Sequence, residues 1–274
     1  MKLPVTSIEP LAGKTVFVTG GARRLGRAIA LTLAHAGADV AVSYRASESE
    51  AARTADNIAA FGRRSLAVPC DVRSEPSVRT AVAQVAAAFG RLDILVNNAA
   101  VFGSAALESL TLAQWDAVFE TNARGPFLVA REALPHLRAA HGRIINMGSL
   151  GGLHAWAGHA HYCASKAALH MLTQAMAKAF APDVSVNCVA PGWIALQEER
   201  RDSESKDQET DALAASRNEA ERRAELQAAR FAAKTPMGRN GDADDVAKAV
   251  LFFATGPHFI TGQTLVVDGG LGLS

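Results

Sequence analysis

The chain has 274 residues, of which 49% are hydrophobic and 6% aromatic, and its formal net charge is +1. A chain of this length can bury a large core without metals, and its near-neutral charge gives no reason to expect a nucleic-acid or membrane partner. The three cysteines are widely spaced and form no Cys-x-x-Cys pair, which indicates a reducing, cytoplasmic environment. The N-terminal residues lack the apolar core of a signal peptide, and no apolar run is long enough to cross a membrane.

Short, almost wholly apolar runs alternate along the chain with longer Ala- and Leu-rich stretches, which is typical of βαβ units with helices on both faces of a sheet. The predicted strands are Thr15–Val18, Asp39–Ser43, Ser65–Val68, Ile94–Val96, Arg143–Asn146, Val184–Val189 and Thr264–Val267. The predicted helices include Leu25–Ala36, Ser74–Phe89, Ala157–Phe180 and Ala243–Ala254. We therefore predict an α/β fold in which residues 1–274 form a single doubly wound Rossmann-type domain with a seven-stranded parallel sheet.

Residues 197–234 interrupt this alternation. The segment is rich in Glu, Arg, Asp, Ser and Ala and contains no β-like run and no proline. Such a composition is typical of a solvated helix, so we interpret the segment as a charged helical lid or a surface insertion. Its place directly after a predicted strand favours a lid, because ligands of parallel sheets bind at the carboxyl ends of the strands.

A glycine-rich turn, TGGARRLG, follows the first predicted strand and opens a helix. Glycine permits a tight turn and a close approach of the backbone to a pyrophosphate, and the helix N-terminus offers N–H groups to that anion. A strand, such a turn and a helix in succession predict a dinucleotide site. Its expected contacts here are Gly20, Arg23, Arg24, Leu25 and Gly26.

The residues after the second predicted strand indicate which dinucleotide is used. An NAD site normally has an acidic residue there, but this chain has Tyr44, Arg45 and Ser47, with no acid before Glu48. Arg45 can pair with a 2′-phosphate and Ser47 can donate to it. The sequence therefore predicts NADP(H).

Two further loops fit the same ligand. Asp71 and Val72 follow the third predicted strand, where Asp71 can accept a hydrogen bond from an adenine amino group. Asn98, Ala99 and Ala100 follow the fourth, where small residues let the backbone lie against the ribose and adenine. We expect all five residues at successive strand ends of one cofactor site.

Tyr162 lies thirteen residues after Ser149, and Lys166 follows Tyr162 by four. Residues four apart on a helix share a face, so the ammonium can lie near the phenol. A free tyrosine has a pKa near ~10, and a neighbouring cation favours the phenolate. We expect Lys166, aided by the charge of an oxidised nicotinamide, to lower the pKa of Tyr162 toward about 7.

These features follow one another along nearly the whole chain. They comprise the TGGARRLG turn, the NNAA segment at 97–100, Asn122, Ser149, Tyr162 with Lys166, and Pro191-Gly192. In this order they resemble the short-chain dehydrogenase/reductase family. The resemblance implies that Tyr162 gives a proton to the substrate, Ser149 hydrogen-bonds it and Asn122 supports a water-linked proton relay. It also implies cofactor contacts from Tyr162, Lys166, Pro191, Gly192 and Ile194, with Lys166 holding the nicotinamide ribose.

Three departures from the family pattern resemble pteridine reductases: Arg24 in place of glycine, Phe102 four residues after Asn98, and Leu196 in place of threonine. Phe102 would then stack on the substrate. Ser149 instead resembles general carbonyl reductases, because pteridine reductases carry Asp there. Three functions stay open: NADPH-dependent reduction of a ketone or 3-oxoacyl carbonyl, reduction of a dihydropterin, and a catalytically silent NADP(H)-binding regulator.

Three histidines, His154, His159 and His161, precede Tyr162. A metal site would need them to converge with a fourth ligand, and their loop contains no carboxylate, so we expect no metal. We expect the pocket of a small-molecule substrate to include Phe102, Ser149, His154 and Trp193. The family resemblance implies a homotetramer.

Overall fold

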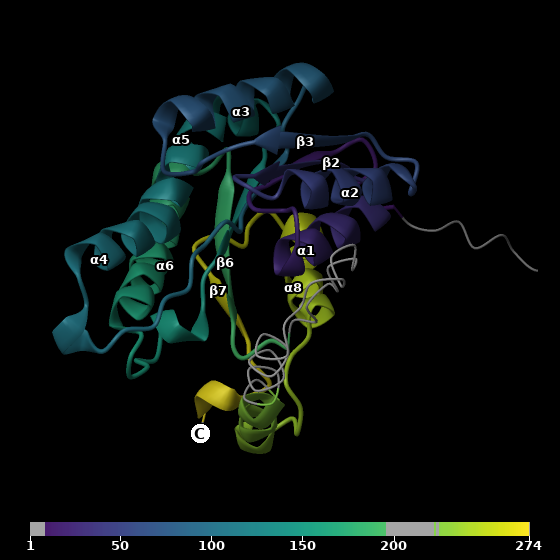
Figure 1. Ribbon diagram of the computed structural model, residues 1–274. Helices are drawn as coiled ribbons and strands as arrows, with labels where there is room; N and C mark the ends of the chain where they lie inside the picture. Colours follow the sequence, from purple (N-terminus) through teal and green to yellow (C-terminus); the bar gives the residue numbers. More distant parts are fainter. Residues whose placement is uncertain (1–8, 196–221, 223–224, 274) are drawn as a thin grey trace, which may run out of the picture.

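The computed structural model describes residues 9–195, 222 and 225–273. Seven parallel strands form one sheet in the order β3-β2-β1-β4-β5-β6-β7 (Figure 1). The strands are β1 Thr15–Val18, β2 Asp39–Tyr44, β3 Ser65–Pro69, β4 Ile94–Asn97, β5 Arg143–Met147, β6 Ser185–Pro191 and β7 Thr264–Val267. The predicted α/β fold with a seven-stranded parallel sheet is therefore confirmed, and the strands β2 to β5 end one residue later than expected.

Helices cover both faces of the sheet because alternate strand residues point to opposite sides. Val16 and Val18 belong to a core formed with α1, α2 and α8, whereas Phe17 belongs to a core formed with α3, α5 and α6. The two groups of helices lie on opposite sides of the sheet in Figure 1. Their bounds are α1 Arg24–His35, α2 Glu48–Ala59, α3 Glu75–Phe89, α4 Leu112–Phe119, α5 Gly125–Ala139, α6 Ala160–Phe180 and α8 Ala243–Thr255.

Two helix boundaries follow from local chemistry. Helix α3 begins after Ser74, whose side chain accepts the N–H of Ser77, and ends at Gly90, which adopts a left-handed conformation. Helix α6 begins at Ala160 rather than at the predicted Ala157, because Gly158 has a φ of 75° that a helix excludes.

One irregularity joins α4 to α5. Residues Glu120–Arg124 form a π-helical turn, η2, between the two α-helices. Such turns insert one extra residue into an otherwise regular helix and occur often at functional sites. The described residues also contain three short 3-10 segments: η1 Leu107–Ser109, η3 Leu150–Gly152 and η5 Leu271–Leu273.

The order of the strands creates one switch point. The chain runs from β1 outward to β2 and β3, and then returns to β4 on the other side of β1. Loops that leave β1 and β4 therefore diverge, which opens a crevice at the carboxyl ends of these strands. The loops start close together, since a Cβ added to Gly20 would lie 3.0 Å from the Cα of Ala99.

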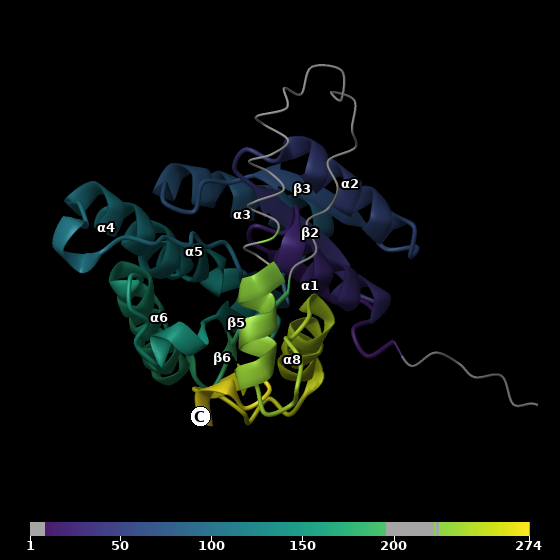
Figure 2. The ribbon, with the colours of Figure 1, turned by 60° about the horizontal axis from the view of Figure 1, so that its bottom comes forward.

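Most of the predicted lid, and Leu196 beside it, lie outside the described residues. Residues 225–234, its last part, are helical and lie next to η5 near the C-terminus (Figures 1 and 2). In the part of the chain that the structure describes, no helix is both long and apolar enough to cross a membrane.

Candidate active site

A cleft of about 640 Å³ opens at the switch point. Segments that follow six strands, β1 to β6, contribute to its wall. All but two of the predicted site residues line it, namely Gly20, Arg23, Arg24, Leu25, Gly26, Tyr44, Arg45, Ser47, Asp71, Val72, Asn98, Ala99, Ala100, Phe102, Ser149, Tyr162, Lys166, Pro191, Gly192, Trp193 and Ile194. The two exceptions are Asn122 and His154.

The glycine turn is packed too tightly for any other residue at Gly26. A Cβ there would collide with the carbonyl of Gly20 and with Nδ2 of Asn98. Asn98 holds the turn by donating from Nδ2 to the carbonyls of Thr19 and Gly20, both at 3.0 Å. The turn is thus rigid and open to a ligand that approaches the backbone closely.

The N-terminus of α1 suits an anion. Its first turn contains no acidic residue, and the N-cap residue Arg23 makes no side-chain capping bond. Arg24, the first helical residue, has a φ of 51°, a left-handed conformation that disfavours a residue with a Cβ. These features fit the pyrophosphate of a dinucleotide.

The second strand ends beside a positive charge. Arg45 is exposed directly after β2, and Ser47 at the head of α2 makes no capping hydrogen bond to that helix. Arg45 lies close enough to Asp71 to contribute to lowering the pKa of that carboxyl. Arginine and hydroxyl groups of this kind fit a ribose 2′-phosphate.

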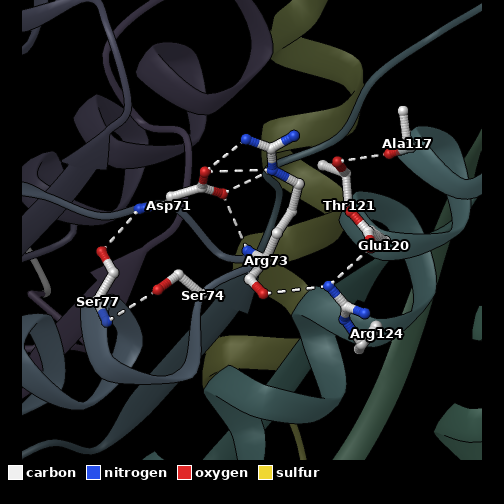
Figure 3. Close-up of polar contacts among 8 residues, drawn as sticks. All are labelled: Asp71, Arg73, Ser74, Ser77, Ala117, Glu120, Thr121 and Arg124. Atoms are coloured by element: carbon white, nitrogen blue, oxygen red, sulfur yellow. Dashed lines mark hydrogen bonds and ion pairs between the residues drawn. The ribbon is translucent and has the colours of Figure 1, made fainter. Parts of the chain in front are cut away.

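The carboxylate of Asp71 has a partner that the sequence did not indicate. Arg73 donates to it from Nε and Nη2, the latter at 2.6 Å (Figure 3). This pairing is the main cause that lowers the pKa of Asp71. The Arg73 carbonyl accepts a hydrogen bond from Arg124 at 3.3 Å, and Arg124 pairs with Glu120 at 3.1 Å. The wall of the cleft at Asp71 is therefore tied to the π-helical turn η2.

Three polar side chains meet at the other end of the cleft. Ser149 follows β5 and is buried, while Tyr162 and the buried Lys166 lie one turn apart on α6. Nζ of Lys166 donates to the carbonyl of Met147 at 2.7 Å and lies 5.8 Å from the centroid of the Tyr162 ring. The predicted proximity of ammonium and phenol ring is therefore present.

The predicted lowering of the Tyr162 pKa includes the charge of an oxidised nicotinamide and stays a prediction; the protein side chains alone act in the opposite direction. Burial raises the pKa of Tyr162, and the hydrogen bond with Ser149 offsets only part of that rise. Burial also lowers the pKa of Lys166 to about 8, and its ammonium donates to the carbonyl of Met147 rather than to the Tyr162 hydroxyl. Tyr162 is thereby kept in the protonated form that a proton donor needs.

Asn122 lies behind the cleft wall. It is fully buried in η2, where Oδ1 accepts the N–H of Val101 and Nδ2 donates to the Val101 carbonyl, both at 2.9 Å. Nδ2 also donates to Oγ of Ser165 at 3.1 Å. Asn122 thus joins the loop after β4 to α6, one residue before Lys166.

Sequence reasoning missed a histidine beneath the site. His170 is 6% exposed, and its Nε2 accepts the N–H of Ser149 at 3.4 Å. Burial and the charge of Lys166 lower its pKa, so the ring is neutral. The helical spacing could have revealed it, since Tyr162, Lys166 and His170 recur every four residues on one face of α6.

The structure corrects one substrate residue. His154 is exposed and lies away from the cleft lining, beside the C-terminal Gly272, whose added Cβ would approach its Nε2 to 3.2 Å. Sequence position suggested otherwise because the loop between β5 and α6 does run along the cleft, but it presents Trp156 there instead. Within the described ranges, no three His, Cys, Asp or Glu residues gather as a metal site.

The doubly wound sheet, the glycine turn and the Tyr162/Lys166 pair together define a dinucleotide-dependent oxidoreductase. A family model described as Enoyl-(Acyl carrier protein) reductase matches residues 20–272. A 3-oxoacyl-[acyl-carrier-protein] reductase of Staphylococcus aureus is 35% identical over 261 residues, which cover 94% of this chain and 98% of that protein. The chain therefore belongs to the short-chain dehydrogenase/reductase family.

Two solved structures agree with this assignment. A short chain dehydrogenase from Burkholderia cenocepacia J2315, in complex with NADP, superposes with a TM-score of 0.80 at 37% identity, covering 96% of this chain and 99% of its own. A dehydrogenase/reductase from Sinorhizobium meliloti 1021 has a TM-score of 0.80 at 35% identity, with coverages of 97% and 98%. The protein is an oxidoreductase of this family.

Proposed function

We propose that the protein reduces a ketone or 3-oxoacyl carbonyl with NADPH, and that Tyr162 is the general acid. The observation that carries the proposal is the meeting of Ser149, Tyr162 and Lys166 at one end of a cleft whose other end is a glycine turn and a helix N-terminus. A bound nicotinamide dinucleotide supplies the hydride in such a reaction.

NADPH is the form that the charges favour. Arg45 and Ser47 take the place where an NAD site would have an acidic residue, and Arg23 adds further positive charge to the cleft. The NADP complex of the Burkholderia relative supports the same choice. Gly20 and Gly26 leave the backbone accessible to the phosphates, and Asn98 keeps it in that shape.

The proton is given at Oη of Tyr162. A raised pKa keeps this hydroxyl protonated at neutral pH, so it can donate to the oxygen of a carbonyl as that oxygen becomes negative. Ser149 hydrogen-bonds the same substrate oxygen, while His170 holds the backbone of Ser149 from behind. Lys166 binds the nicotinamide ribose and Asn122 positions α6 beside the loop after β4.

The experiment is NADPH oxidation measured side by side with simple ketones, an acetoacetyl thioester and a dihydropterin. Turnover of a ketone or thioester by wild type, lost in Tyr162→Phe, supports carbonyl reduction. Turnover confined to the dihydropterin would replace it with pteridine reduction, which the cleft positions of Arg24 and Phe102 favour. Tight NADPH binding without turnover on any substrate would indicate a silent regulator.

We also propose a homotetramer, because large apolar side chains are exposed on strand β7 and on helices α5, α6 and α8. The edge strand β7 exposes Leu265 and Val266 by 37% and 38%, with Phe252 of α8 nearby in the fold. Phe127 of α5 and Met171 of α6 are exposed as well. Two different symmetric contacts on one chain assemble four copies. Sedimentation equilibrium tests this, and a monomer at micromolar concentration would contradict it.

A further inference from the structure

Aromatic rings form the wall at the substrate end of the cleft. Phe102 comes from the loop after β4, Trp156 from the loop before α6 and Trp193 from the segment after β6. All three line the same cleft as Tyr162. Three segments that are distant in the sequence thus each bring a large ring to the place where the proton is transferred.

The Phe102 ring is held in place without being buried. It stacks on His159 with ring centroids 4.6 Å apart and planes inclined by 29°. His159 is itself fixed by a 2.8 Å hydrogen bond from Nδ1 to the carbonyl of Gly103. Phe102 nevertheless remains 61% exposed. An apolar ring that is fixed and left open at a cleft is suited to hold a ligand.

Two of these rings contact the proton donor. Phe102 meets Tyr162 edge-on, with centroids 4.8 Å apart and an angle of 77° between planes. Trp156 lies nearly parallel to Tyr162, at 6.3 Å and 19°. A carbonyl that reaches the Tyr162 hydroxyl therefore brings the rest of its molecule close to both aromatic walls.

Among the residues that the structure describes, the same end of the cleft offers little to an anionic chain. The arginines that line the cleft, Arg23, Arg24 and Arg45, follow β1 and β2 rather than the strands that carry the aromatic wall. Lys166 donates to the carbonyl of Met147. Trp193 is stacked on Phe231 at 4.2 Å and 9°, which extends the apolar wall to Phe231.

We propose that the substrate is a flat, uncharged ring ketone whose face packs on one of the two rings Phe102 and Trp156 while its edge meets the other, rather than an extended acyl thioester. A planar ring gains stacking as well as apolar burial on such walls, whereas a flexible chain gains burial alone. The inference rests on the proposed function. In the reaction, a hydride from NADPH bonds to the carbonyl carbon and a proton from Tyr162 bonds to the oxygen, giving an alcohol and NADP⁺.

The experiment compares kcat/KM for NADPH oxidation on two sets of substrates. The ring set is 1-tetralone, 1-indanone and isatin, and the linear set is the N-acetylcysteamine thioesters of acetoacetate and 3-oxohexanoate. We expect at least one ring ketone to exceed both thioesters by roughly tenfold or more, the gain that one stacked and one edge-on aromatic contact can provide.

Variants then test the wall itself. Phe102→Leu and Trp156→Leu should each lower kcat/KM for the ring ketone by roughly tenfold, mainly through KM, and lower the thioester values by a smaller factor. Phe61→Leu removes an exposed ring that packs on His35, away from the cleft, and is the matched control. NADPH affinity, followed by fluorescence, should stay unchanged in all three variants and shows that each is folded.

The outcomes distinguish the proposed ring-ketone substrate from the proposed carbonyl reduction on which it rests. If thioesters are turned over faster than every ring ketone, or if both leucine variants lower the two sets equally, the ring substrate is wrong and carbonyl reduction stands. If a dihydropterin is preferred to every ketone, a ring is bound but its ketone chemistry is wrong. If no carbonyl is reduced although NADPH binds, the proposed function itself is wrong.

Discussion

The ammonium of Lys166 lies 5.8 Å from the ring centroid of Tyr162, and it is directed at the carbonyl that ends β5. Burial lowers the pKa of Lys166 to about 8 and raises the pKa of Tyr162. At neutral pH the pair therefore consists of a neutral phenol beside a buried cation. Such a pair can give a proton to an oxygen, because the phenol still carries its proton at neutral pH.

Tyr162→Phe should remove the proposed proton donor and leave the fold intact, because the hydroxyl is lost while the ring contacts with Phe102 and Trp156 are kept. We expect kcat to fall by roughly 10²–10⁴-fold, the usual contribution of a general acid. The NADPH dissociation constant should change by less than about threefold. A variant with near wild-type turnover would exclude Tyr162 as the acid.

Lys166→Met should change how stability depends on pH. Between the folded pKa of about 8 and the ordinary value of 10.5, folded Lys166 has lost its proton while the unfolded chain still binds it. The stability contribution from this group therefore rises with pH in that window. Lys166→Met lacks this rise. The free energy of unfolding of the variant, relative to that of wild type, should therefore fall by about 2 kcal/mol between pH 8 and 10.

Urea unfolding of both proteins at fixed pH values measures this difference. Lys178→Met, on an exposed part of the same helix, is the control and should show no such change. A constant difference between wild type and Lys166→Met across the window would show that Lys166 keeps an ordinary pKa in the folded protein.

Arg45→Ala should weaken NADPH binding selectively. Loss of a charge-assisted pair with the 2′-phosphate costs about 2 kcal/mol, which is roughly a thirtyfold rise in the dissociation constant. NADH lacks that phosphate, so its affinity should stay the same. Arg79→Ala removes an exposed charge on α3 outside the cleft and serves as the control. Equal losses for NADPH and NADH would contradict the assignment.

The left-handed backbone conformation at Arg24 can be tested by substitution. Arg24→Gly and Arg24→Ala remove the same side-chain interactions, but only glycine adopts a φ of 51° without strain. We expect the glycine variant to be more stable by roughly 1 kcal/mol in urea unfolding. At Arg23, where φ is −154°, the alanine variant should be more stable than the glycine variant, because glycine loses more backbone entropy on folding.

Asp93→Asn should destabilise the protein. The buried carboxylate of Asp93 accepts from the N–H of Thr15, from Lys14 and from Arg91. Burial alone would raise its pKa, but these donors outweigh burial and hold the pKa below the ordinary value. We expect a loss of roughly 2 kcal/mol at pH 7, since Lys14 and Arg91 stay partly exposed.

The stabilisation that the Asp93 carboxylate provides should decrease in acid. The stabilisation is complete above the unfolded pKa near ~3.9 and is lost as pH falls through the lower folded pKa. Thermal unfolding midpoints of wild type and Asp93→Asn should therefore converge in acid. Midpoints that fall in parallel down to pH 2 would show that Asp93 contributes nothing through its charge.

Local sequence patterns predict those structural features that are set by residues close together in the chain. Strand β1 and the positions of Tyr162 and Lys166 on α6 follow from apolar runs and helical spacing, as does the glycine turn between β1 and α1. The start of α6 was placed too early because a glycine with positive φ carries no distinct signal within an Ala-rich stretch.

Properties that arise from burial could not be predicted in this way. The pKa of Tyr162 depends on how deeply α6 is covered, and the direction of the Lys166 ammonium depends on where β5 ends. The pairing of Asp71 with Arg73 and the exposed position of His154 likewise depend on tertiary contacts. No periodicity in the sequence encodes them.

The π-helical turn at Glu120–Arg124 fixes the length of the chain between α4 and α5. Removing one residue there would restore a continuous α-helix and rotate everything beyond it by about 100°. Asn122 would then face away from Val101 and Ser165, and Arg124 would leave Arg73. A single-residue deletion in η2 would thus break the contacts at both ends of the cleft at once. The length of this short turn therefore determines how the residues that support the site are oriented.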